Sequence, residues 1–162
     1  MHVTRRGFIT VAAIGSLVPM MPACATRPRR SRRPAAEPLR LACIGTANRA
    51  WDNIQELRHE RIVALCDVDA GYLARASSEF PDAQTFRDFR ELLAMERELD
   101  LDGVVVSTPD HTHALATALA LQAGLPVYCE KPLTRTVREL GVLRSLWERH
   151  PVATQMGTQI HA

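Results

Sequence analysis

Lysine is almost absent from this chain of 162 residues, which holds 19 arginines and one lysine, Lys131. The exception needs a reason, because arginine stays charged and planar, whereas lysine is a compact ammonium that can lose its proton when buried. Lys131 stands in Glu130-Lys131-Pro132, directly after the apolar run Pro126-Val127-Tyr128-Cys129. We therefore expect it at the carboxyl end of a strand, where open α/β sheets bind their ligands. A surface lysine without a role is the alternative.

Cysteine is also scarce, and its spacing excludes two classes of site. Apart from Cys24, the chain has Cys43, Cys66 and Cys129, each within or at the end of an apolar run. An odd, widely spaced set of three predicts neither a disulfide framework nor a zinc site. We expect three buried side chains that act as small apolar groups.

Two further patterns in the sequence predict neither a metal site nor a membrane span. His111 and His113 stand two residues apart, but no Cys, Asp or Glu is placed to complete a metal site, so no metal is expected. The apolar run at residues 8–18 is shorter than the ~20 residues that a membrane span needs. We therefore expect no membrane span.

Positive charge is concentrated at the N-terminus. Residues 1–38 contain seven arginines and one acid, a balance of +6 against +2 for the whole chain, so residues 39–162 carry −4. A nucleic-acid-binding domain would need a basic face, which a mildly acidic domain does not offer. No nucleic-acid partner is expected.

The first 25 residues are typical of an export signal. Thr4-Arg5-Arg6-Gly7-Phe8-Ile9 resembles the twin-arginine motif, and the apolar run follows it. We expect cleavage after Ala25, with lipidation of Cys24 or an uncleaved N-terminal anchor as alternatives. Residues 26–38, rich in Pro and Arg, predict a disordered linker. Since the twin-arginine route exports folded proteins, often with a cofactor inserted, this leader favours a periplasmic, cofactor-containing protein.

From residue 39 onward, short apolar runs alternate with amphipathic segments, which predicts a doubly wound parallel α/β sheet in a single domain, 39–162. We expect six strands, at 39–44, 61–66, 84–86, 101–107, 127–129 and 152–156. The helices are expected at 48–57, 69–79, from 88, 111–123 and 136–149. Capping-box spacings stand at Asp88 with Glu91 and at Thr136 with Glu139.

The first strand-to-helix turn carries a partial phosphate-binding fingerprint, Gly45-Thr46-Ala47-Asn48-Arg49-Ala50, in which Ala47 replaces the second glycine. Asp67 ends the next strand, 22 residues after Gly45. An acid there accepts the ribose hydroxyls and repels a 2′-phosphate, so we expect NAD rather than NADP. Asp67 as a helix cap is the alternative, although Asp69 is better placed for that role.

The fourth strand leads into Ser107-Thr108-Pro109-Asp110-His111-Thr112-His113. Its proline fixes a turn, and its hydroxyls and the following helix amides can contact a cofactor. We take Ser107, Thr108, Pro109, His111 and His113 as candidate cofactor-binding residues. Helix capping and purely structural roles are the alternative for Asp110 and His113.

These segments together resemble the Gfo/Idh/MocA oxidoreductases, the relatives of glucose–fructose oxidoreductase and inositol dehydrogenase. The resemblance rests on T-P-x-x-x-H at 108–113, Ala123-Gly124 and Val127-Tyr128-Cys129-Glu130-Lys131-Pro132-Leu133, and it covers residues 39–162. It implies that Lys131 lies beside the nicotinamide and substrate and assists proton transfer. It also implies that Glu130 and Pro132 position Lys131, and that Glu130 and Lys131 border the cofactor.

In this family a substrate-binding domain follows the sixth strand, and we expect it to be absent from these 162 residues. A fragment of a longer protein is favoured over a stand-alone remnant. The resemblance implies hydride transfer from a CH–OH group of a sugar or polyol to NAD. A glycosidase of the same family, using transient oxidation, and a non-catalytic NAD-binding module are the alternatives. A homo-oligomer of the full-length protein is a further expectation, while the sugar and the stereochemistry stay open.

Overall fold

The computed structural model describes residues 37–158, so the predicted signal, the lipidation site Cys24, most of the linker and the last four residues lie outside it. Strands and helices alternate along the described residues. They are β1 Arg40–Ile44, α1 Arg49–Glu56, β2 Arg61–Cys66, α2 Ala70–Glu79, β3 Gln84–Phe86, α3 Phe89–Ala94, β4 Gly103–Val106, α4 Asp110–Gln122, β5 Val127–Glu130, α5 Val137–Arg149 and β6 Thr154–Gly157.

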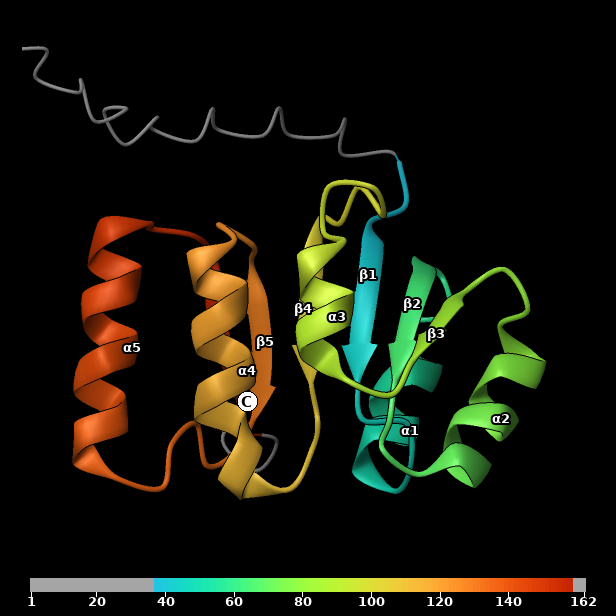
Figure 1. Ribbon diagram of the computed structural model, residues 1–162, viewed down its shortest axis with the longest axis horizontal. Helices are drawn as coiled ribbons and strands as arrows, with labels where there is room; N and C mark the ends of the chain where they lie inside the picture. Colours follow the sequence, from blue (N-terminus) through green and yellow to red (C-terminus); the bar gives the residue numbers. More distant parts are fainter. Residues whose placement is uncertain (1–36, 159–162) are drawn as a thin grey trace, which may run out of the picture. The chain divides into compact units, whose positions relative to one another are not determined.

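The six strands of the described residues are parallel and form one sheet in the order β3-β2-β1-β4-β5-β6. Figure 1 labels β1 to β5 of this sheet. The chain winds outward from β1 in one direction and then from β4 in the other, so the order reverses between these two strands. Because every strand is parallel, the loops after their carboxyl ends lie along the same edge of the sheet. The predicted doubly wound fold is confirmed.

Helices cover both faces of the sheet, and alternate residues of β1 enter different cores. Leu41 and Cys43 pack with Ile54 of α1 and Leu73 of α2 in one apolar cluster. Ala42 and Ile44, which point to the other face, belong to the cluster that includes residues of α3, α4 and α5. This alternation is the period of two that a strand imposes. It fixes the register of the central strand, and with it the position of the turn that follows.

The three cysteines within the described residues are free and buried, as predicted. Burial in the apolar core disfavours the thiolate and raises the pKa of Cys43 to about 12. Burial, followed by the nearby Asp67 carboxylate, raises the pKa of Cys66 to about 12. Both thiols are therefore uncharged packing groups near neutral pH.

Several predicted boundaries shift by a residue or two, and one capping box is not formed. The fourth strand begins at Gly103 rather than 101, because the Leu101 amide donates to the Glu96 carbonyl and closes the turn after α3. Thr136 and Glu139 form the predicted box at α5. At α3, the Asp88 carboxylate instead accepts from the Arg90 amide and guanidinium. This Asp88–Arg90 ion pair is found in place of the capping-box hydrogen bond that the Asp88 amide would donate to the Glu91 side chain.

No helix among residues 37–158 combines the length and apolar character needed to cross a bilayer. Over the same residues, no cluster of three or more His, Cys, Asp or Glu side chains could hold a metal ion.

Candidate functional site

The turn after β1 requires a glycine where it passes β4. Gly45 has φ 97°, and its amide donates to the Cys66 carbonyl over 2.8 Å. A Cβ at this position would stand 2.6 Å from the Ser107 carbonyl oxygen and 3.3 Å from the Ala50 side chain. Any larger residue would therefore push β1 away from the start of the loop after β4. Gly45 and Ala50, the first and third positions of the fingerprint, thus allow β1 and α1 to lie close to the start of the loop after β4.

The second fingerprint position has a different consequence. Ala47 is partly exposed, and its carbonyl accepts the Ala50 amide, which helps to start α1. The left-handed backbone falls on the next residue, Asn48, with φ 51° and ψ −123°, and its side chain makes no capping hydrogen bond. Such a conformation in a non-glycine residue costs on the order of 1–3 kcal/mol. The loop thus stores backbone strain at the N-terminus of α1, where a phosphate would bind.

Asp67 at the end of β2 is held by the phosphate loop itself. Its Oδ2 accepts from the Thr46 amide over 2.8 Å and from the Thr46 hydroxyl over 2.9 Å, while its Oδ1 accepts from the Asp69 amide over 3.0 Å. Helix α2 is capped by Asp69, as predicted, through bonds from the Gly71 and Tyr72 amides. A carboxylate has about four acceptor sites, so Asp67 keeps about one for a ribose hydroxyl rather than serving both freely.

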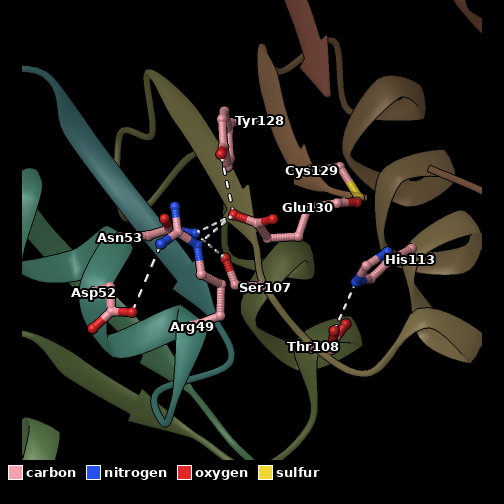
Figure 2. A network of polar contacts seen from close by, with 9 residues as sticks. All are labelled: Arg49, Asp52, Asn53, Ser107, Thr108, His113, Tyr128, Cys129 and Glu130. Carbon is pink, nitrogen blue, oxygen red and sulfur yellow. Dashed lines mark hydrogen bonds and ion pairs between the residues drawn. The ribbon is translucent and has the colours of Figure 1, made fainter. Parts of the chain in front are cut away.

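A buried carboxylate connects α1, β4 and β5 (Figure 2). Glu130 is 5% exposed, and its Oε1 accepts from Asn53 Nδ2 over 2.9 Å, from the Tyr128 hydroxyl over 3.1 Å and from Arg49 Nε over 3.2 Å. The Asn53 amide also donates to Ser107 Oγ over 2.9 Å. The hydrogen bond that Arg49 donates to Glu130 raises the pKa of the Arg49 guanidinium. Glu130 thus holds the Arg49 guanidinium at the end of β5.

His113 joins two turns from inside α4. Its ring is 1% exposed, with Nδ1 2.7 Å from the Pro132 carbonyl oxygen and Nε2 2.7 Å from the Thr108 carbonyl oxygen. Burial alone would lower the pKa of His113, but the Cys129 side chain and the two carbonyl groups outweigh it and raise that pKa to about 9. Both ring nitrogens are engaged by main chain, which favours the structural role considered above over direct contact with the cofactor.

Lys131 follows β5 directly, as predicted, but its side chain is exposed. It makes no hydrogen bond or ion pair with any residue of the described range 37–158. The Lys131–Pro132 peptide bond is cis. Pro109 and His111 are also exposed, while the Thr112 hydroxyl donates to the Thr108 hydroxyl over 2.6 Å. The structure therefore brings Lys131 to the same edge of the sheet as the fingerprint loop and Asp67.

Sequence reasoning missed two members of this site, Asn53 and Tyr128. Asn53 stands four residues after Arg49, so the two lie on one face of α1. That spacing together with the polar side chain at a buried helix position is the signal that could have found Asn53. Tyr128 lies two residues before Glu130 on β5, and its hydroxyl turns back to the Glu130 carboxylate.

The arrangement fits a dinucleotide. The α1 N-terminus with its exposed Asn48 and Arg49 would hold the pyrophosphate, because helix amides and a guanidinium both favour anions. Asp67 would hold the adenosine ribose. Thr108 and Lys131, which follow β4 and β5, would border the nicotinamide half. The donors and acceptors present are those that a pyrophosphate between two ribose groups requires.

Comparison with known proteins supports the binding of NAD by this fold. Residues 39–158 match the oxidoreductase family with an NAD-binding Rossmann fold, Gfo/Idh/MocA. A glycosyl hydrolase family 109 protein of Stenotrophomonas maltophilia is 36% identical in an alignment of 140 residues that covers 78% of this chain and 29% of that protein. Inositol 2-dehydrogenase 1 of Saccharopolyspora erythraea is 37% identical in an alignment of 107 residues that covers 62% of this chain and 31% of that protein.

Solved structures show the same fold. The crystal structure of myo-inositol 2-dehydrogenase from Lactobacillus plantarum superposes with a TM-score of 0.68 at 28% identity, over 75% of this chain and 36% of that one. A scyllo-inositol dehydrogenase from Lactobacillus casei, solved with NAD(H) and scyllo-inositol, superposes with a TM-score of 0.67 at 21% identity, over 75% of this chain and 36% of that one. The chain thus spans about a third of the length of the relatives it matches. It belongs to the Gfo/Idh/MocA oxidoreductase family, and NAD is the cofactor of the Rossmann fold that defines this part of the family.

Proposed function

We propose that residues 39–158 form the NAD-holding half of an oxidoreductase that acts on a CH–OH group of a sugar or polyol. One observation carries the proposal: the fingerprint loop, Asp67 and the only lysine of the chain lie at one edge of the sheet. The inositol dehydrogenases among the similar proteins support the substrate class. The substrate side of the active site would come from a domain that follows, as the resemblance to the family implies.

In this proposal NAD, when bound, supplies the hydride acceptor. The chain's own residues bind and orient it: the α1 N-terminus and Arg49 hold the pyrophosphate, and Asp67 holds the ribose. Glu130 fixes Arg49 and the end of β5, so that Lys131 emerges at a defined place. The exposed Lys131 ammonium, a mobile point charge on a long stem, would hydrogen-bond the substrate hydroxyl and handle its proton.

Exchange of Lys131 for arginine tests the assignment of this residue. In the protein with its substrate domain, Lys131→Arg should leave the NAD(H) affinity nearly unchanged and reduce turnover by ~10²-fold or more, the usual effect of losing an acid–base group. Arg135→Lys, an exposed exchange in the same loop, is the matched control and should keep full turnover. Near-normal turnover in Lys131→Arg would show that Lys131 provides only a positive charge at this position and no acid–base catalysis.

A glycosidase that oxidises its sugar transiently and then reduces it again is the second candidate. The glycosyl hydrolase family 109 relative, which matches 78% of this chain, favours it. Such an enzyme turns over without added NAD, because the bound cofactor is regenerated in each cycle. Release of the leaving group without net NADH formation would support this candidate, and steady NADH formation with a free polyol would support the first. Binding of NAD with neither reaction would indicate a non-catalytic module.

We further propose that the protein is exported by the twin-arginine route to the periplasm, on the basis of Arg5-Arg6 and the apolar run that follows. Exchange of both arginines for lysine should block export without affecting the fold, since the arginine pair is recognised by the export machinery and is not part of the folded core. Fractionation of cells that express the two forms measures this. Mature protein outside the cytoplasm in the Lys-Lys form would contradict the proposal.

A further inference from the structure

The ring of His113 meets two acceptors that belong to different turns. Thr108 lies in the turn after β4, and Pro132 directly follows Lys131 in the turn after β5. Both contacts are made to carbonyl oxygens, each at 2.7 Å. The link differs from the one through Asn53, which joins the same two strand ends by side chains, at Ser107 Oγ and Glu130 Oε1.

The number of protons on the His113 ring follows from the two carbonyl oxygens that it contacts. A carbonyl oxygen accepts hydrogen bonds and cannot donate, whereas a neutral imidazole carries one N–H and one lone pair. A neutral His113 would therefore turn a lone pair toward one of the two carbonyl oxygens at 2.7 Å. Both contacts are satisfied only when both nitrogens are protonated. Distances of this length are also those of hydrogen bonds from a charged donor.

The surroundings of the ring agree with a charged form. A buried charge is tolerated when it is fully hydrogen-bonded, and both N–H groups of His113 have acceptors. Cys129 on β5 is the titratable group beside the ring, and its thiol points to the Glu130 carbonyl oxygen, 3.4 Å away. Burial opposes the charge, but the contacts with Cys129, Pro132 and Thr108 together raise the pKa of His113 to about 9.

We propose that His113 is a positioning residue: as an imidazolium it clamps the Thr108 turn to the Pro132 turn and thereby sets the place from which Lys131 emerges. The histidine of the T-P-x-x-x-H motif then acts through the backbone, and it orients Lys131 without touching cofactor or substrate. The importance of this clamp for catalysis rests on the proposed function of Lys131. The tests below need neither cofactor nor substrate, so a failure of the clamp is distinguishable from a failure of that function.

The first test uses the unaltered 162-residue chain labelled with ¹⁵N-histidine. We expect both ring nitrogens of His113 to carry a proton at about pH 7.5, with slow exchange, because the ring is buried. The exposed His150 gives a signal from a ring in contact with water and serves as an internal comparison. The His113 signals are assigned as those missing from His113→Gln. An unprotonated ring nitrogen on His113 at that pH would overturn the proposal, whether or not any variant folds.

The second test uses the single lysine as a reporter. In a sample labelled with ¹³C-lysine, the Cα–Hα group of Lys131 gives one signal. We expect this signal to shift with an inflection near pH 9 in the unaltered chain and in His150→Gln. In His113→Gln the inflection should vanish and the signal should move or broaden, while circular dichroism shows the fold retained. A Lys131 signal with the same position and titration in His113→Gln would refute the clamp.

Discussion

Replacing Asp67 with asparagine should abolish the preference of this chain for NADH over NADPH. In the proposed complex the Asp67 carboxylate would meet the adenosine ribose at the end of β2, where a 2′-phosphate would bring a second negative charge. With three hydrogen bonds already made to Thr46 and Asp69, Asp67 has about one acceptor site left for a ribose hydroxyl. The preference therefore rests on one charged hydrogen bond and on repulsion of the phosphate.

The magnitude follows from these two terms. A hydrogen bond to a charged group contributes about 1.5–3 kcal/mol, and loss of a neutral one about 1 kcal/mol. We expect NADH to bind more tightly than NADPH by on the order of 1–3 kcal/mol, which is roughly 5- to 150-fold in Kd. In Asp67→Asn the two affinities should agree within a few-fold, because the amide keeps an acceptor oxygen but loses the charge.

Asparagine is the better substitution, because alanine would leave the buried Thr46 amide and hydroxyl without their acceptor. That loss costs about 1–3 kcal/mol of stability and would confuse folding with binding. Asp69→Asn is the matched control: it removes the same charge two residues away and keeps a good helix cap for α2. Quenching of protein fluorescence and the emission of the reduced nucleotide measure both affinities. An unchanged preference in Asp67→Asn, or an equal loss in Asp69→Asn, would refute the role of Asp67.

Four other changes, three substitutions and a rise in pH, have defined outcomes. Ala47→Gly should tighten NADH binding, since it removes a methyl group from the loop that the pyrophosphate would approach. Weaker binding by titration would contradict this. Gly141→Ala, which places a methyl group in open space on α5, should raise the stability by about 0.5–1 kcal/mol, whereas Gly124→Ala, at φ 70°, should lower it by about 1 kcal/mol in urea unfolding. The pKa of His113 in the folded protein lies above its unfolded value of about 6.5, so the stabilisation from the protonated ring is complete below about pH 6.5 and is lost as the pH rises toward 9. The free energy of unfolding should fall by on the order of 1–3 kcal/mol over this range. This fall should be absent from His113→Gln.

The sequence was sufficient for the fold because each element has a local signal. Three successive valines predict the covered strand β4, and Asp69 and Thr136 mark the beginnings of α2 and α5. The end of each strand then places Gly45 and Lys131 at one edge, as parallel pairing requires. These inferences need only neighbours in the chain and the geometry of a parallel sheet.

The contacts that organise the site could not be predicted in the same way. Asn53 and Glu130 meet although they are 77 residues apart in the chain. No spacing rule connects them, since their approach depends on how α1 packs against the sheet. For the same reason the sequence could not tell which groups the His113 ring would meet. The sequence predicts Asp67 as an acceptor for the ribose hydroxyls, but its position also makes it the acceptor for Thr46.

The central claim is that Lys131 lies beside the nicotinamide of a bound NAD. Because the chain has one lysine, ¹³C-lysine labelling gives one Cε signal, and this signal reports on the Lys131 ammonium alone. ADP-ribose contains the adenosine, pyrophosphate and second ribose of NAD but lacks the nicotinamide. We predict that NAD shifts the Lys131 Cε signal at saturation, whereas saturating ADP-ribose shifts it much less. Equal shifts with the two ligands, or no shift while both are bound, would contradict the account.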